Sequence, residues 1–391
     1  MRMVWYELRK IWNSRILLVV ALLCTLFYWL FMSFYIDFFP NGHPAIEEFE
    51  YSNELLDRYG PTLEEDEYVE FISANREKVI AEMERYIKSN PVFAKVGISS
   101  YEDYERVYKK QNPTEAETEA LWTLLGKESN FVRFKLQTIE WIENQYRDYP
   151  RYVSELMAEA TNQKEIDRLN AILETKEYTN IMEWEVYENT VGYTVYLAIL
   201  SILAVFVLVS PLIVTDRARN VHLLQYSSKH GRKILQKQLL AVLLSAFMLT
   251  TLLILIFGAI YSTNGTWVFW HSGMTSFLNG PIFLFDITYG QYIVLYIVLL
   301  YTLCLGTAAM AFLFSRFSRN LITLILKLMP MFAVLTVLCL YVFNDPFSMN
   351  NSLYKALGMI GIEPLVCGGV FIVFLAVSLY FVRREKEVEV I

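Results

Sequence analysis

The segment from Asp216 to Lys237, reading DRARNVHLLQYSSKHGRKILQK, gathers basic side chains between two long uncharged runs. It contains six Lys or Arg residues and only one acidic residue. The positive-inside bias places such a segment in the cytoplasm. The contacts it can make are electrostatic and apolar, either with lipid headgroups or with a soluble protein.

Apolar residues recur within this segment at Ala218, Val221 and Leu224. This three-residue spacing predicts a short amphipathic helix. Two interpretations remain open for it. The segment is either an ordinary charged loop whose Lys and Arg side chains set the membrane topology, or a helix that docks on a partner.

Catalytic and nucleotide-binding motifs are missing from the sequence. Gly126-Lys127 lacks both the upstream Gly and the following Ser or Thr of a phosphate-binding loop. The four His residues are scattered across loops, so the sequence predicts no zinc site. The expected apolar spans contain Lys327 but no acidic residue or His, which argues against catalysis inside a membrane. We therefore expect no enzyme activity and no bound cofactor in this chain.

Six apolar runs must position the basic segment. The chain is 55% hydrophobic with a positive mean hydropathy, and each run is long enough to cross a bilayer. The predicted fold class is therefore an all-α polytopic membrane protein. The six predicted spans are residues 16–36, 190–215, 238–261, 289–314, 320–343 and 364–382.

The segments between the spans divide by charge. Residues 41–189 hold 32 acidic and 17 basic residues, whereas the rest of the chain holds 9 acidic and 17 basic residues. This division predicts an extracellular domain at 37–189, with both termini in the cytoplasm. Helical spacing and few glycines predict that the domain is all-helical. The other predicted segments are an elbow helix at 1–15, the cytoplasmic segment 216–237, extracellular segments 262–288 and 344–363, and a cytoplasmic tail at 383–391.

The first fifteen residues predict a helix that lies in the membrane interface. Five apolar residues are spaced to share one helical face, namely Val4, Trp5, Leu8, Ile11 and Trp12. Glu7, Arg9 and Lys10 are assigned mostly to the opposite face. Two Trp beside Arg and Lys suit the headgroup boundary. The interfacial residues predicted here are Trp5, Leu8, Arg9, Lys10 and Trp12.

Local signals predict details of the outer segments. Thr62 and Glu65 fit a capping box that opens a helix. A long helix is expected to start at Pro113 and to be interrupted at Pro150. The aromatic segment 262–288 is expected on or in the outer leaflet. Residues 344–363 are expected to form short helices that enter the outer leaflet and turn back.

The basic segment resembles the coupling segment between the second and third helices of ABC-2 type transporter permeases. The matching residues, in order, are Asp216, Leu223, Leu224, Tyr226-Ser227-Ser228, Arg232 and Lys237. Asn220 replaces the usual Gly, and no Pro follows the Ser pair. The elbow is similar to that of the same family through Glu7, Leu8, Lys10, Ile11, Trp12, Ser14 and Arg15. The resemblance covers about 240 residues in scattered pieces.

The resemblance implies contacts, partners and a function. It implies that an ATPase is contacted by Asp216, Arg217, Val221, Leu223, Leu224, Tyr226 and Arg232. The implied partners are cytoplasmic ABC ATPase subunits that hydrolyse ATP with Mg²⁺, a second permease subunit in a homo- or heterodimer, and membrane lipids, without nucleic acid. The implied function is ATP-driven export of a hydrophobic or amphipathic substrate such as a peptide, across a plasma membrane that is expected to be bacterial. The alternative is a non-transporting receptor or immunity protein that binds a ligand through the helical domain.

Overall fold

The computed structural model describes residues 2–160, 162–220 and 234–387. Within these residues the chain is all-helical and contains no β-strand. Six helices there are long and apolar enough to cross a membrane, which confirms the predicted number and indicates a multi-pass membrane protein. These spans are Ser14–Met32, Trp184–Ala218, Ile234–Asn264, Tyr289–Arg316, Leu321–Val342 and Ile362–Arg384.

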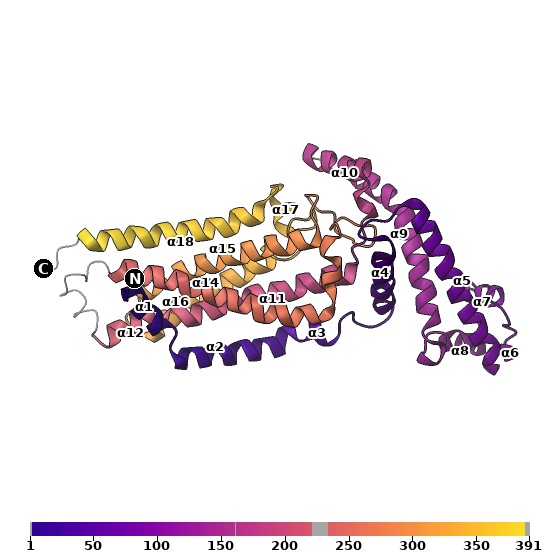
Figure 1. The fold of residues 1–391 in the computed structure, drawn as a ribbon, viewed down its shortest axis with the longest axis horizontal. Helices are drawn as coiled ribbons and strands as arrows, with labels where there is room; N and C mark the ends of the chain where they lie inside the picture. Colours follow the sequence, from indigo (N-terminus) through magenta and orange to yellow (C-terminus); the bar gives the residue numbers. More distant parts are fainter. Residues whose placement is uncertain (1, 161, 221–233, 388–391) are drawn as a thin grey trace.

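The molecule is elongated, with the bundle of six spans at one end and a separate helical body at the other (Figure 1). We call this body the helical domain. Helix α1, Arg2–Ile11, lies at the same end of the bundle as the C-terminal end of α18, Ile362–Glu387. The domain comprises α4 Ala45–Tyr59, α5 Glu65–Ser89, α6 Pro91–Lys95, α7 Tyr101–Tyr108, α8 Glu115–Thr123, α9 Val132–Glu159 and α10 Gln163–Thr175.

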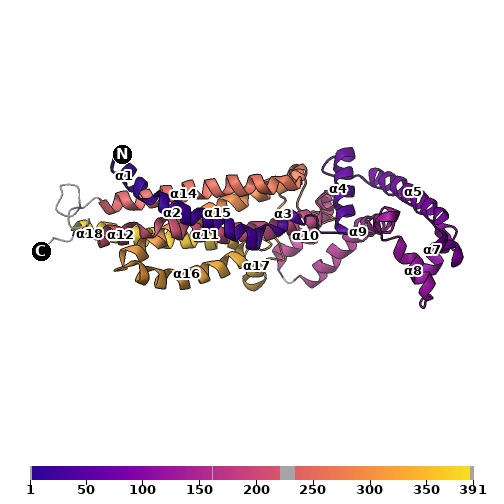
Figure 2. The same cartoon turned by 90° about the horizontal axis from the view of Figure 1, so that it is seen from below.

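One helix forms the centre of the bundle (Figure 2). Helix α11, Trp184–Val209, continues into α12, Pro211–Ala218, and 83% of its most apolar window is buried, against 11% for the first span. The contrast shows that α11 is the helix around which the others pack. Its neighbours include α2 Ser14–Phe27, α14 Ile234–Tyr261, α15 Tyr289–Arg316 and α16 Leu321–Val342.

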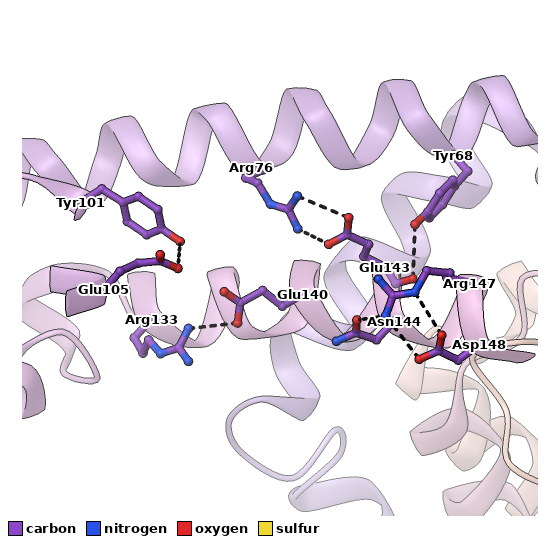
Figure 3. Close-up of polar contacts among 10 residues, drawn as sticks. All are labelled: Tyr68, Arg76, Tyr101, Glu105, Arg133, Glu140, Glu143, Asn144, Arg147 and Asp148. Atoms are coloured by element: carbon purple, nitrogen blue, oxygen red, sulfur yellow. Dashed lines mark hydrogen bonds and ion pairs between the residues drawn. The ribbon is translucent and has the colours of Figure 1, made fainter. Parts of the chain in front are cut away.

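The helical domain is built on the contact between α5 and α9 (Figure 3). Phe71 and Val79 of α5 are buried together with Ile139 of α9. Beside this core, Arg76 forms an ion pair with Glu143. The contact therefore has both an apolar core and polar bonds that set how the two helices align.

The helix boundaries inside the domain differ from those predicted. Pro150 lies inside α9 and does not interrupt it. Proline removes one backbone hydrogen bond, but burial of the adjacent Tyr149 and Val153 holds the helix together. The long helix expected from Pro113 is instead two helices, because the backbone between α8 and α9 takes positive φ at Asn130 and Phe131.

The capping box at the start of α5 is also shifted from its predicted position. Glu64 is the N-cap residue, and its partner is Glu67 rather than the pair Thr62 and Glu65. A carboxylate at this position accepts backbone N–H bonds as Ser or Thr would.

The aromatic segment 262–288 joins the bundle to the helical domain. The backbone N–H of Phe277 donates to the carbonyl of Tyr178 at 2.8 Å, and Arg168 Nε donates to the carbonyl of Phe283 at 2.9 Å. Phe277 is buried in the core of the domain, whereas Trp267 is 66% exposed. This contact with the helical domain was not predicted, and it arises because an irregular backbone needs hydrogen-bond partners that protein supplies. The position of the segment on or in the outer leaflet stays a prediction.

The segment 344–363 contains one short helix among its described residues, α17, Ser352–Leu357. Tyr354 on this helix donates its hydroxyl hydrogen to Glu165 of α10 at 2.6 Å. This bond is a second connection between the bundle and the helical domain.

Candidate functional site

Four polar side chains meet at the end of the bundle that carries the basic segment. We call Glu7, Lys10, Asp216 and Gln238 the basal network. Lys10 Nζ lies 2.9 Å from Glu7 Oε1 and 2.9 Å from Asp216 Oδ2. Gln238 Nε2 donates to Glu7 Oε2 at 3.2 Å and to Asp216 Oδ2 at 3.0 Å. The network thus joins α1, α12 and α14.

The position of Glu7 follows from the helical repeat of α1. Val4, Glu7 and Ile11 are all buried, and their spacing of three and four residues places them on one face. The assignment of Glu7 to the exposed face was therefore wrong. The reason is that Lys10 and Gln238 supply bonds that offset the cost of burying a carboxylate.

The electrostatics of the network depend on one ammonium group. The side chains of Glu7 and Asp216 are only 4% and 9% exposed, whereas that of Lys10 is 36% exposed. Burial by itself lowers the pKa of Lys10, but the hydrogen bonds and charges of Glu7 and Asp216 outweigh it, so the pKa is raised. Lys10 therefore stays charged at physiological pH and holds the two carboxylates together.

Arg217 makes a second connection at the same end of the bundle. Its guanidinium group donates to the carbonyls of Ser318 and Arg316, the latter at 2.9 Å. These carbonyls lie where α15 ends and the turn to α16 begins. Asp216 and Arg217, which are adjacent in the sequence, therefore tie α12 to different parts of the bundle.

A cavity of about 770 Å³ lies beside the basal network. Its lining includes Arg9, Arg15 and Arg219 together with Lys10 and Asp216. The excess of positive charge favours an anionic group. The described residues contain no group of three His, Cys, Asp or Glu side chains placed to hold a metal ion. The charges that line the cavity can therefore bind an anionic group.

The predicted interfacial residues of α1 divide between two surroundings. Trp5 is 65% exposed, and Arg9 is exposed as well. Leu8 and Trp12 pack against the core of the bundle, and Trp12 Nε1 donates to Ser245 Oγ at 3.1 Å. Part of α1 is therefore attached to α14, and the rest faces outward.

The predicted coupling residues are described only in part. Asp216 and Arg217 belong to the two connections above. Five further predicted residues lie outside the described part of the chain, namely Val221, Leu223, Leu224, Tyr226 and Arg232.

Sequence reasoning missed Glu7, Gln238 and Ser245 as members of this site. A signal existed for Glu7, because it shares the spacing of Val4 and Ile11. For Gln238 the signal was a lone amide at the start of an apolar span, where a buried polar group needs a partner. No signal identified Ser245, whose role depends on the approach of Trp12.

Comparison with known proteins does not assign this chain to a family. No family model, curated protein or solved structure matches this chain.

Proposed function

We propose that this chain is the membrane-spanning permease subunit of an ATP-driven ABC-2 type exporter. The observation that supports it most is the basal network. It ties α1, α12 and α14 together on both sides of residues 221–233, which belong to the segment 216–237 that resembles the family's coupling segment. A force applied to that segment would reach three helices through short ionic and hydrogen bonds.

The proposal assigns ATP hydrolysis to cytoplasmic partner subunits. In it, the helical domain is extracellular, both termini are cytoplasmic, and a second permease subunit completes the transporter in the plasma membrane of a bacterium. The first, fifth and sixth spans, with only 11%, 17% and 17% of their windows buried, offer apolar faces to lipid or to that second subunit. Nearly uncharged spans favour a hydrophobic or amphipathic cargo such as a peptide.

The orientation can be tested with single cysteines in a cysteine-free background. Cysteine in place of the exposed Glu115 on α8 is expected to react with a membrane-impermeant thiol reagent on intact cells. Cysteine in place of Ser228 is expected to react only after permeabilisation, because the basic segment is expected inside. Labelling of Ser228→Cys alone on intact cells would reverse the proposed topology.

Coupling can be tested with the double variant Val221→Asp and Leu224→Asp. We expect a normally inserted protein that no longer co-purifies with its ATPase, because an unpaired buried charge costs several kcal/mol (about 3–5) at an apolar contact. The measurement is affinity purification from the native membrane, with mass spectrometry of the associated chains.

The matched control is Gln225→Asp with His230→Asp, which adds acidic charge to the same segment without removing apolar side chains or the residues that carry the resemblance. We expect this control to retain the ATPase. Full association in the Val221 and Leu224 double variant would remove support for ATPase coupling, and a non-transporting role would then be favoured.

A further inference from the structure

A second cavity lies where the helical domain meets the bundle. It measures about 320 Å³, which is within the range of small-molecule sites. Its walls come from α9, from the first residue of α11 and from the segment that precedes α15. Such joints between structural units are common places for ligands.

Half of the ten residues that line this cavity are aromatic. These five are Trp141, Tyr149, Tyr152, Trp184 and Phe277. Ring faces carry negative electrostatic potential, so a cage of several rings attracts a cation.

The polar lining of the cavity is electrostatically negative, like the faces of the aromatic rings. Asp148 contributes a carboxylate, and none of the described lining residues is Lys, Arg or His. Arg147 donates to Asp148 at 3.0 Å, as Figure 3 shows, but both side chains are about 60% exposed, so the pair is weak. The Arg147 hydrogen bond lowers the pKa of Asp148, which keeps the carboxylate charged at neutral pH.

Two buried polar atoms in the walls have unused hydrogen-bonding capacity. Asn279 Oδ1 and the Tyr149 hydroxyl group have no hydrogen-bond partner in the structure. Asn279 is 2% exposed and Tyr149 is 4% exposed. Both atoms are themselves buried, so they belong to the packed wall behind the cavity surface, and the aromatic rings and Asp148 carry the contact with a ligand.

We propose that this cavity binds a small organic cation through an alkylated ammonium group. The aromatic walls stabilise the cation by cation–π contact, and the carboxylate of Asp148 adds charge attraction. A bound cation would touch α9 of the helical domain and Trp184 at the start of the central helix together. The proposal concerns the isolated chain and does not depend on ATPase coupling.

The test is equilibrium dialysis of radiolabelled choline against the purified full chain in detergent micelles. We expect saturable binding of choline. The neutral carbon analogue of choline, 3,3-dimethylbutan-1-ol, is expected to displace the labelled choline at least about tenfold less well than unlabelled choline does. Equal competition by the neutral analogue, or no saturable binding, would overturn the proposal.

Variants locate the bound cation. Trp184→Leu is expected to weaken choline binding about tenfold, and Trp184→Phe is expected to recover part of it, because one strong cation–π contact contributes about that factor. The matched control is Trp122→Leu, which removes a Trp that is 66% exposed on α8 and outside the cavity. Equal effects of Trp184→Leu and Trp122→Leu would contradict the assignment.

A conservative variant keeps the test decisive if Trp184→Leu does not fold. Asp148→Asn alters an exposed side chain and is expected to weaken choline binding about threefold while leaving binding of the neutral analogue unchanged. An unchanged choline affinity would overturn the proposal.

The lipid composition of the nanodisc distinguishes two sources of the cation, a lipid headgroup and a soluble molecule. Weaker choline binding in phosphatidylcholine nanodiscs than in phosphatidylglycerol nanodiscs would identify a lipid headgroup as the occupant. Equal binding in the two would identify a soluble cation, and either result supports the cavity as the site.

Discussion

Lys10→Met is expected to lower the free energy of unfolding by about 3 kcal/mol, which is the lower end of the cost of breaking a buried ion pair. The variant would leave the carboxylates of Glu7 and Asp216 buried without the ammonium group that lies 2.9 Å from each. The lower end applies because Lys10 itself is partly exposed. The measurement is denaturant unfolding in detergent micelles.

The control for this prediction is Arg9→Met, which removes the same charge from an exposed position of the same helix. We expect it to change the free energy of unfolding by less than about 0.5 kcal/mol. Adding Glu7→Gln to Lys10→Met should restore more than half of the loss, because one buried charge is then removed. Equal stability of Lys10→Met and Arg9→Met would show that the basal network contributes no net stability.

Wild-type stability is expected to fall as pH rises from about 4.5 to about 8, owing to Glu183 at the start of α11. Its carboxyl group is fully buried and accepts hydrogen bonds from the backbone N–H groups of Glu185 and Val186, each at 2.9 Å. Burial nevertheless raises its pKa to about 8. The folded protein therefore holds a proton that the unfolded chain releases near pH 4.5, so acid favours the folded state in this window.

Glu48 on α4 adds a second, narrower pH range in which stability is expected to fall as pH rises. Burial and the nearby charges of Glu185 and Glu47 raise the pKa of Glu48 to about 7. Glu47 itself lies 2.7 Å from His43 Nδ1. The expected slope is at most about 1.4 kcal/mol per pH unit for each group.

The two windows can be separated by substitution. Glu183→Gln should remove the decline in stability between pH 7 and 8, whereas Glu48→Gln should reduce the decline below pH 7 and leave that above it. The measurement is the midpoint of thermal unfolding in detergent across this pH range. An unchanged profile in Glu183→Gln would show that this carboxyl group is ionised in the folded protein.

Much of the membrane fold could be predicted because it depends on local composition. Apolar runs of transmembrane length identified all six spans. Their ends were less predictable. The second span extends over Trp184–Ala218 rather than 190–215, because charged residues at its C-terminal end, such as Asp216 and Arg217, find partners in the protein instead of in water.

The candidate site was predictable only where charge itself was the signal. Lys10 was singled out as a basic residue of an interfacial helix, and Asp216 and Arg217 as charged residues of the segment that resembles a coupling segment. Their actual partners could not be found from spacing, because Lys10 and Asp216 are 206 residues apart in the sequence. Likewise, Pro150 remained helical because tertiary packing outweighed its intrinsic preference.

The central helix determines where the bundle is stiff and where it can bend. A helical run from Trp184 to Ala218 separates Glu183 from Asp216 by about 50 Å, at about 1.5 Å per residue. Other helices pack closely around α11, so this run behaves as a stiff rod. Pro211 removes the backbone bond to the carbonyl of Val207, so the rod has a soft point just before the basal network. Any bending of this helical run is therefore expected at Pro211, five residues from Asp216.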